Sequence, residues 1–258
     1  FHAKISKEII KNAGVDVDIV GFHGQTIFHN AQVKISKQIG DGNLLSSLLK
    51  KNVVYNFREN DIHNGGQGAP LAPIFHNLLV NKNKIEKPAC VLNIGGIANI
   101  TLVISKNNED LKSFDVGPGN CLLDEWVRRH TQMKYDDNGK ASNIGKTSEV
   151  ILNQAIDNFD NISNQKKLSF DIKDFDLSFV KGLTYEDGLS TLVDFTAIII
   201  YQSILKSINS EENKKLLIIV CGGGRKNLSL MESIRKRLPK NIYLKIIDDY
   251  KIDGDFIE

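Results

Sequence analysis

The spacing of apolar residues predicts that the first 88 residues alternate between helices and short strands. Apolar side chains recur at helical intervals over residues 1–13, and this pattern ends at Gly14. The stretch 61–73 is punctuated by glycine and proline and predicts a loop. The polar, lysine-rich stretch 81–88 is typical of a domain boundary. The other elements expected here are a strand over 15–21, a helix over 41–51, a strand over 53–57 and a helix over 74–80.

After residue 88 the pattern changes to apolar strands joined by tight turns. Strands are predicted over 89–94 and 97–105, and Gly95-Gly96 between them is typical of a hairpin. The elements expected next are a turn at 107–108, a strand over 111–116, a helix over 120–131, a helix over 193–208, a strand over 216–221, a helix over 227–238 and a strand over 242–247. This order predicts an α/β domain with a mixed sheet and helices on both faces.

The composition argues against several classes of partner. Hydrophobic residues make up 41% of the 258 residues, and the formal net charge is +2. No strong electric field would therefore attract nucleic acid or a membrane surface. The three cysteines are far apart, which favours a reducing compartment over a disulfide framework. The apolar runs are strand-sized, and residues 1–10 lack a signal-peptide core, so we expect a cytoplasmic protein.

Glycine-rich turns follow three of the predicted strands and give the clearest functional signal. Glycine lets a backbone approach a phosphate group, and a following helix adds its positive N-terminal end. Taken singly, each turn is better explained as a tight turn, but three at strand ends favour a ligand crevice at the carboxyl edge of the sheet. The turns are Asn93-Ile94-Gly95-Gly96, Gly117-Pro118-Gly119-Asn120 and Cys221-Gly222-Gly223-Gly224.

Asp115 ends a strand directly before the second of these turns. Its carboxylate could act as a general base, hold a metal ion through water, or cap the next turn, and the spacing leaves these roles open. Asp124 and Glu125 fit a solvated helix face that complements the helix dipole. Residues 139–147 fail as a P-loop, because five residues separate the glycines and no strand precedes them, so a surface loop is predicted.

Polar residues of the first domain form two further candidate groups. His23 and His29 lack nearby partners of the right type, so no metal site is predicted there. His23, Gln25 and Thr26 are better suited to substrate contacts or to hydrogen bonds within their loop. The second group, a polar binding loop, would consist of Asp61, Gly65, Gly66 and Gln67.

Five motifs occur in one order and together resemble the anhydro-N-acetylmuramic acid kinase family over nearly the whole chain. They are His23-Gly24-Gln25-Thr26, Gly65-Gly66-Gln67-Gly68-Ala69-Pro70-Leu71, Asn93-Ile94-Gly95-Gly96-Ile97-Ala98-Asn99, Asp115-Val116-Gly117-Pro118-Gly119-Asn120 and Cys221-Gly222-Gly223-Gly224. The resemblance implies an α/β protein of the actin, Hsp70 and sugar-kinase fold. Two ribonuclease-H-like domains, residues 1–88 and 89–258, would close on ATP and an amino sugar.

The resemblance also implies a reaction and its residues. The kinase would open the 1,6-anhydro bridge of a cell-wall sugar with water and phosphorylate the freed sixth oxygen, in peptidoglycan recycling. Asp115 would activate the water, with ATP and Mg²⁺ as cofactors. The implied nucleotide contacts are Gly95, Gly96, Gly117, Gly119 and Asn120 at the phosphates, and Gly222, Gly223 and Gly224 at the adenosine. The implied sugar contacts are His23, Gln25, Thr26, Asp61, Gly66 and Gln67.

The chain also departs from the family pattern. It lacks the glycine- and serine-rich hairpin with which family members begin, so we expect a first domain without its opening strands and with an unpaired sheet edge. Phe256-Ile257-Glu258 resembles the start of a family helix, and residues 166–175 match the substrate-side segment loosely. We expect weak or absent kinase activity from these residues alone. The alternatives are an inactive relic or sugar-binding protein, or a relative acting on hexoses or polyphosphate; a homodimer stays open.

Overall fold

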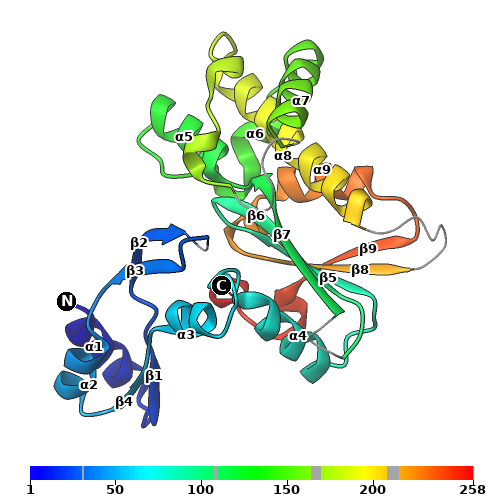
Figure 1. Ribbon diagram of the computed structural model, residues 1–258. Helices are drawn as coiled ribbons and strands as arrows, with labels where there is room; N and C mark the ends of the chain where they lie inside the picture. The colour runs from blue at the N-terminus through cyan, green and yellow to red at the C-terminus, as the bar shows by residue number, and fades with distance from the viewer. Residues whose placement is uncertain (31, 107–109, 164–169, 208–214, 258) are drawn as a thin grey trace. The chain divides into compact units, whose positions relative to one another are not determined.

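The computed structural model describes residues 1–30, 32–106, 110–163, 170–207 and 215–257 (Figure 1). The chain divides into two compact units, Phe1–Leu71 (unit 1) and Ala72–Glu258 (unit 2). Four sequence predictions lie wholly or partly outside the described residues: the turn at 107–108, residues 166–169 of the loosely matching segment, residue 208 of a predicted helix, and Glu258.

Unit 1 combines helices with short pairs of strands. Helix α1 (His2–Ala13) ends at Gly14 in the left-handed conformation, and α2 (Gly42–Leu49) begins where the Asp41 carboxylate accepts the N–H of Leu44 at 2.9 Å. These caps explain why the sequence predicted both helices to within two residues. Strands β1 (Ile19–Gly21) and β4 (Asn52–Val54) are parallel and, among the described residues, pair only with each other.

Unit 1 also contains an antiparallel hairpin and a short helix that the sequence pattern does not predict. Strands β2 (Gln25–Asn30) and β3 (Ile35–Ile39) are mostly exposed, and their register shifts between Thr26 and Phe28. This irregularity breaks the alternation by which a half-buried strand is recognised. Helix α3 (Phe57–His63) occupies the start of the stretch predicted to be a loop. It buries Ile62 as its single fully buried residue, so it carries no helical periodicity in its sequence.

A five-stranded mixed sheet forms the centre of unit 2, with the order β7-β6-β5-β8-β9. Strand β5 (Ala89–Ile94) is antiparallel to β6 (Ile97–Val103), which is antiparallel to β7 (Leu111–Pro118). On the other side, β8 (Leu216–Cys221) lies parallel to β5, and β9 (Ile242–Ile246) lies parallel to β8. The predicted α/β class with a mixed sheet is confirmed.

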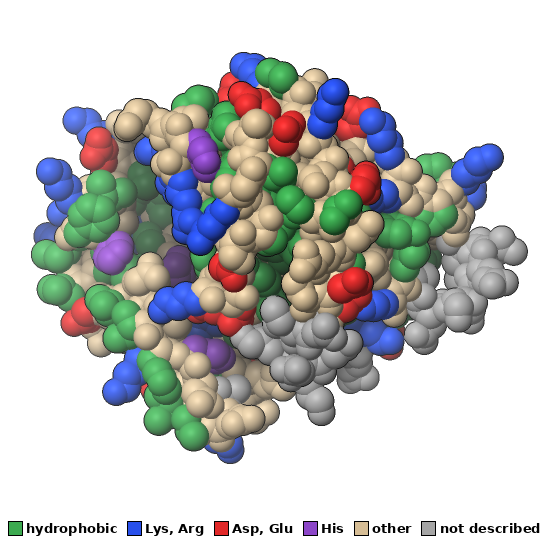
Figure 2. Space-filling view, turned by 90° about the horizontal axis from the view of Figure 1, so that it is seen from above, with side chains coloured by type: hydrophobic (Ala, Val, Ile, Leu, Met, Phe, Trp, Pro, Cys, Tyr) green, Lys and Arg blue, Asp and Glu red, His purple; other side chains and the backbone are tan. Residues whose placement is uncertain are grey.

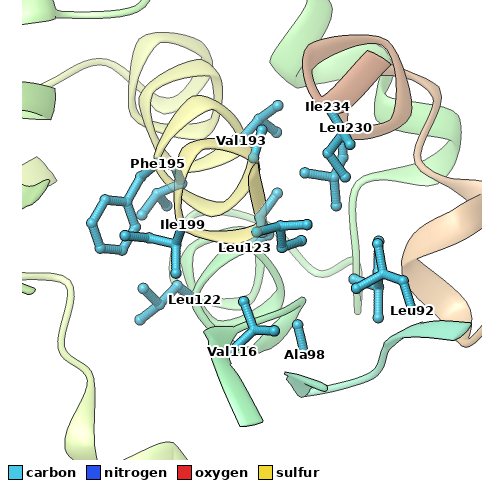
Figure 3. Close-up of a cluster of buried hydrophobic side chains, with 14 of the residues drawn as sticks. Leu92, Ala98, Val116, Leu122, Leu123, Val193, Phe195, Ile199, Leu230 and Ile234 are labelled. Atoms are coloured by element: carbon cyan, nitrogen blue, oxygen red, sulfur yellow. The ribbon is translucent and has the colours of Figure 1, made fainter. Parts of the chain in front are cut away.

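Separate hydrophobic clusters cover the two faces of this sheet. All residues of β5 are buried, and Cys90, Leu92 and Ile94 join one cluster while Ala89 and Val91 join the other. Burial on both faces produces the continuous apolar run from which the strand was predicted. The first cluster includes side chains of α5 (Cys121–His130), α7 (Glu149–Ser163), α8 (Tyr185–Ser207) and α9 (Leu228–Arg237) (Figure 3). The second includes side chains of α4 (Ala72–Lys82) and of residues 247–257.

Helix α4 belongs to unit 2, which places the division between the units before the stretch 81–88 suggested by the sequence. Leu79 and Val80 pack into the second cluster, and the buried His76 Nδ1 lies 2.9 Å from Thr101 Oγ1 on β6. The polar residues 81–88 therefore connect α4 to β5 within one packed body. The polar composition of residues 81–88 indicates a connection at the surface. The packing of α4 on the sheet shows that this connection lies within unit 2.

Residues 139–147 do not form the surface loop predicted from the failed P-loop pattern. They contain α6 (Lys140–Ile144), whose Ser142 is buried. The buried Asp136 carboxylate accepts the N–H groups of Ala141 and Ser142 at 2.9 and 3.0 Å, and it also accepts the Ser142 hydroxyl at 2.7 Å. These bonds satisfy the donors at the start of the helix.

Helix α8 begins well before the apolar segment predicted from residue 193. By length and composition it could cross a membrane, but 61% of its most apolar window is buried inside the protein. Ile199 of α8 lies near Leu122 of α5 in the first cluster (Figure 3), and the Phe195 ring contacts that of Phe159 on α7 at a centroid distance of 6.0 Å. Its apolarity is therefore explained by its central place in the core. The face shown in Figure 2 carries both acidic and basic side chains, in keeping with the small net charge of +2.

Candidate active site

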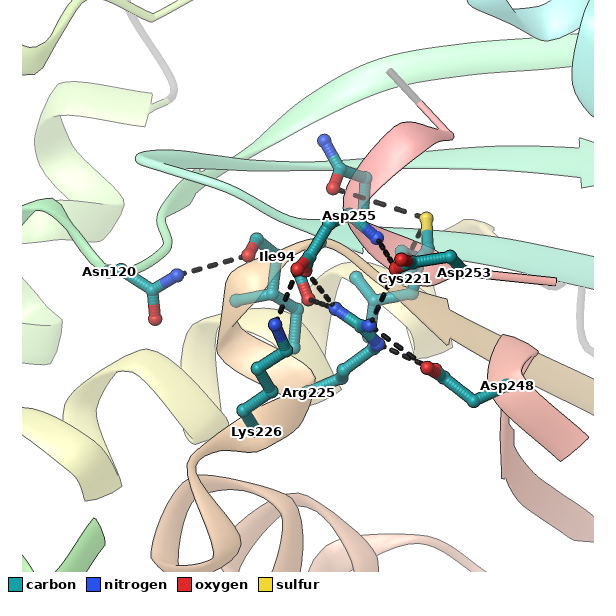
Figure 4. A network of polar contacts seen from close by, with 11 residues as sticks. Ile94, Asn120, Cys221, Arg225, Lys226, Asp248, Asp253 and Asp255 are labelled. Carbon is teal, nitrogen blue, oxygen red and sulfur yellow. Dashed lines mark hydrogen bonds and ion pairs between the residues drawn. The ribbon is translucent and has the colours of Figure 1, made fainter. Parts of the chain in front are cut away.

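The three glycine-rich turns of unit 2 come together at one edge of its sheet. The main-chain N–H groups of Gly119 and Asn120 donate to the carbonyl oxygens of Gly96 and Gly95 at 2.9 and 2.7 Å. The Asn120 side-chain amide donates to the carbonyl oxygen of Ile94 at 3.0 Å (Figure 4). These bonds join the first turn to the second. The sequence placed the turns at strand ends, and the sheet order explains why they meet.

The third turn packs against the other two through its glycines. A Cβ atom on Gly224 would lie 2.2 Å from Ile94 Cγ2 and 3.0 Å from Asn120 Oδ1. A Cβ atom on Gly222, which has a φ of +78°, would lie 2.2 Å from Asn93 Oδ1. Any larger residue at these two positions would separate the turns, so packing alone explains both glycines.

The predicted phosphate-facing glycines differ in their surroundings. A Cβ atom on Gly119 would lie 2.3 Å from the carbonyl oxygen of Gly95, and one on Gly117 would meet Ile199 and Phe159 at 2.9 Å in the core. A Cβ atom on Gly96 would find Ile172 at 3.6 Å as its nearest neighbour. Gly95 is similarly open, with the nearest atom at 3.4 Å. Close packing therefore requires glycine at residues 117 and 119, but it does not require glycine at residues 95 and 96.

Asp115 lies on β7 opposite Asn99 of β6, at the same edge of the sheet as the glycine turns. Its Oδ2 atom accepts the main-chain N–H of Phe170 at 2.9 Å. Burial raises the pKa of the Asp115 carboxyl group, and the hydrogen bond from Phe170 partly opposes that rise. A carboxylate with a raised pKa is better matched to proton abstraction near neutral pH than an ordinary exposed aspartate.

The segment that begins at Phe170 contacts both Asp115 and the first glycine turn. The Phe170 ring packs with Phe159 and Phe175, at centroid distances of 5.8 and 5.4 Å. Two residues later, Ile172 approaches the open side of Gly96. This segment matches the family pattern only loosely, and a main-chain donor such as the Phe170 N–H leaves no signal in side-chain type.

Asp124, in the first turn of α5, is not part of the solvated face predicted from the sequence. Its side chain is half-buried, and burial raises its pKa to about 6, although Arg128 acts in the opposite direction. The preceding Cys121 is buried, and burial raises the pKa of its thiol to about 11, as for a cysteine that packs in the core and is not a nucleophile. Glu125 does form an exposed ion pair with Arg129 on the next turn, as a solvated face would.

The raised pKa of Asp124 predicts a pH-dependent difference between the protein and its Asp124→Asn variant. The folded state binds the proton of this carboxyl group more tightly than the unfolded state does. The stabilisation that the protonated group gives is therefore complete below the ordinary pKa of 3.8 and is lost as the pH rises to about 6. After allowance for solvent screening, the free energy of unfolding of the variant, relative to that of the parent protein, should rise by about 1 kcal/mol between pH 4 and pH 7.5. Urea unfolding followed by Trp126 fluorescence measures this difference. If the difference in unfolding free energy between variant and parent does not change with pH, the pKa of Asp124 is not raised in the folded protein.

The predicted polar residues of unit 1 form two groups. His23, just before β2, and Gln25, at its start, are exposed, and the Thr26 hydroxyl accepts the Gln38 side-chain amide within the hairpin at 3.3 Å. These exposed side chains are available for a ligand. Thr26 instead has a contact within the hairpin, as the alternative interpretation of loop-stabilising bonds allowed.

The second group is the loop after α3, which Asp61 holds in place. Asp61 Oδ2 accepts the N–H of Gly68 at 2.7 Å, and the Asp61 carbonyl oxygen accepts the N–H of Gly66 at 2.8 Å. Arg58 donates to the carbonyl oxygen of Gly68 at 3.0 Å from the same helix. A Cβ atom on Gly66 would lie 2.1 Å from Asp61 Oδ2. Asp61 therefore shapes the loop that presents the exposed Gln67.

Comparison with known families settles the membership of this chain. The sequence model of the family described as anhydro-N-acetylmuramic acid kinase matches residues 3–258. This chain belongs to the anhydro-N-acetylmuramic acid kinase family. The resemblance drawn from the five motifs is thereby confirmed.

Curated members of the anhydro-N-acetylmuramic acid kinase family match the whole chain. The protein of Pelagibacter ubique (strain HTCC1062) is 98% identical over 258 residues, which cover 100% of this chain and 69% of the relative. That of Rhodospirillum rubrum is 36% identical over 257 residues, covering 100% and 66%, and that of Zymomonas mobilis is 35% identical over 260 residues, covering 100% and 68%. The chain spans about two thirds of the length of these relatives.

The solved structures that this chain is similar to are distant in sequence. The activator of the 2-hydroxyisocaproyl-CoA dehydratase from Clostridium difficile with bound ADPNP has a TM-score of 0.48 and 12% identity, covering 99% of this chain and 76% of that chain. The ROK hexokinase from Thermus thermophilus has a TM-score of 0.36 and 12% identity, covering 99% and 83%.

The residues of this anhydro-N-acetylmuramic acid kinase family member fit the cofactors that the family implies. Open glycines at Gly96 and Gly223 leave room for a nucleotide, since the nearest atoms to a Cβ there are 3.6 and 3.7 Å away. Within the described ranges, no group of three or more His, Cys, Asp or Glu side chains could hold a metal ion. Mg²⁺ in kinase sites keeps water and phosphate oxygens among its ligands, so the half-buried Asp115 at this edge of the sheet fits contact with the ion through water.

Proposed function

We propose that the protein is an ATP-dependent kinase that opens 1,6-anhydro-N-acetylmuramic acid and phosphorylates it to N-acetylmuramic acid 6-phosphate. The observation that carries this proposal is the meeting of three glycine-rich turns with the half-buried Asp115 at one sheet edge. Family membership supplies the substrate class. The product would return a cell-wall sugar to metabolism, and we propose that this recycling takes place in the cytoplasm.

In the proposed reaction Asp115 takes a proton from water as the water oxygen attacks the anomeric carbon. The bond between that carbon and the bridging sixth oxygen breaks, and the freed oxygen takes the γ-phosphoryl group of ATP, so ADP leaves. Burial of Asp115 raises its pKa and favours this proton transfer near neutral pH. Mg²⁺ held by the phosphate oxygens would neutralise the charge of the phosphates.

The nucleotide and sugar contacts remain the ones named from the sequence. The turns at Gly95-Gly96 and Gly117–Asn120 are proposed to contact the phosphates, and residues 222–224 the adenosine. The residues proposed to contact the sugar are His23, Gln25, Thr26, Asp61, Gly66 and Gln67. Exposure of His23, Gln25 and Gln67 and the fixed loop at Asp61 support these roles.

A product assay tests the proposal in two forms of the protein. One is the 258-residue chain, and the other is the same chain extended by the remaining residues of the Pelagibacter ubique relative, here called the extended protein. With ATP, Mg²⁺ and the anhydro sugar, the extended protein should release equal amounts of ADP and sugar 6-phosphate. In H₂¹⁸O the label should enter the anomeric hydroxyl group and not the phosphate. Phosphorylation of glucose but not of the anhydro sugar would refute the proposed substrate.

A further inference from the structure

Arg225 follows the third glycine turn and has a guanidinium group that is fully hydrogen-bonded (Figure 4). Asp248 accepts from Nε and Nη2 at 2.6 and 2.9 Å, and Asp255 accepts from Nη1 at 2.5 Å. Asp253 lies 3.4 Å from Nη2, and the Gly222 carbonyl oxygen accepts from Nη1 at 3.0 Å. These contacts use all five N–H donors of a guanidinium. The side chain is only 4% exposed.

The bonds of Arg225 fix the main chain of the glycine turn. The Gly222 carbonyl oxygen is held by the guanidinium, and the Gly222 N–H donates to the Gly254 carbonyl oxygen at 2.9 Å. Gly254 packs directly on Arg225, because a Cβ atom there would lie 2.4 Å from Nε. Both polar main-chain groups of Gly222 therefore depend on Arg225 or on the segment 247–257.

The segment that carries the three aspartates is itself anchored to the sheet. Ile247 and Ile257, one at each end, are 1% and 5% exposed and belong to the second hydrophobic cluster. Between them, the Asp253 carboxylate accepts the N–H of Asp255 at 2.9 Å. The carboxylates thus approach Arg225 from a fixed backbone, and the turn is held from the side of this segment.

The opposite side of the turn is open. Gly223 is exposed, and a Cβ atom there would have Asn120 Nδ2 at 3.7 Å as its nearest neighbour. We propose that Arg225, with Asp248 and Asp255, positions residues 222–224 for the nucleotide, so that ATP affinity depends on this clamp although none of the three need touch ATP. The inference rests on the proposed function, which assigns ATP to these turns.

The conservative variants Asp248→Asn and Asp255→Asn test the clamp in the extended protein. Each keeps the shape of the side chain and removes its charge, and both carboxylates are partly exposed, so the fold should persist. The expected result is a rise of about tenfold in the Kd for Mg-ADP and in the KM for ATP. The KM for the anhydro sugar should change by less than about twofold. Arg225→Lys, which keeps the charge but loses the fork geometry, should show the same selective loss.

The Asp194→Asn variant is the matched control. Asp194 pairs with Arg237 at 2.9 Å and ties α8 to α9, and its side chain is 23% exposed, against 39% for Asp248 and 40% for Asp255. It should lower the unfolding midpoint as much as the clamp variants while leaving the KM for ATP unchanged. Equal effects of all variants on ATP and sugar, or no effect of the clamp variants on ATP, would overturn the inference and leave the proposed function standing. A parent protein that binds no ADP would overturn both.

Discussion

Asp115→Asn is expected to lower kcat of the extended protein by about a thousandfold, within the usual range for loss of a general base. The asparagine Oδ1 can still accept the N–H of Phe170, so the local structure should stay as it is. ADP affinity should therefore change by less than about threefold. The measurement is kcat for sugar phosphate formation together with calorimetric binding of Mg-ADP.

Asp187→Asn provides a control for the loss of a carboxylate in general. Asp187 also accepts a main-chain N–H, that of Lys146 at 2.7 Å, but it lies at the start of α8 and outside the glycine turns. This variant should keep the parent kcat. Turnover of the Asp115 variant within about tenfold of the parent, roughly 1.4 kcal/mol of barrier, would refute its role as the base.

Gly119→Ala and Gly96→Ala are expected to fail in different ways. The new Cβ at residue 119 would overlap the Gly95 carbonyl oxygen at 2.3 Å, which should lower the free energy of unfolding by roughly 2–3 kcal/mol and abolish ADP binding. At residue 96 the nearest atom is 3.6 Å away, so stability should change by less than about 1 kcal/mol. ADP affinity should nevertheless fall at least about tenfold, because the methyl group would occupy the space of a phosphate.

Urea unfolding and calorimetry on the same two variants separate these effects. Each variant acts as the control for the other, since both add one methyl group to neighbouring turns. A Gly96→Ala variant that binds ADP as well as the parent would show that no phosphate reaches this turn. A Gly119→Ala variant of parental stability would contradict the close approach of the second turn to Gly95.

The sheet of unit 2 was predictable because its central strands are buried on both faces. Such strands appear as continuous apolar runs, and each is bounded by glycine or a polar turn. The β2–β3 hairpin was not predictable in this way. Its residues are largely exposed, and the register shift at Thr26 and Phe28 places apolar residues out of alternation.

The candidate site shows the same limit at the level of single residues. Motif order identified the glycine turns, but it could not separate Gly119, which packing requires, from Gly96, which packing does not. That distinction depends on contacts between turns far apart in the sequence. Arg225 gave no signal as an isolated arginine, because its partners lie 23 to 30 residues later. The acidic stretch after β9 was the available clue, and it needed the fold to be interpreted.

The pairing of β5 with β8 has a consequence for how the sheet assembles. It joins Ala89 to Leu217, while β5, β6 and β7 are joined by short connections. The three-stranded meander can therefore form early, whereas the centre of the sheet must wait for a distant segment to arrive. Until then β5 exposes an unpaired apolar edge, a surface open to misassembly during synthesis. Pulse-labelled hydrogen exchange should find the amides of β6 protected before those of β8.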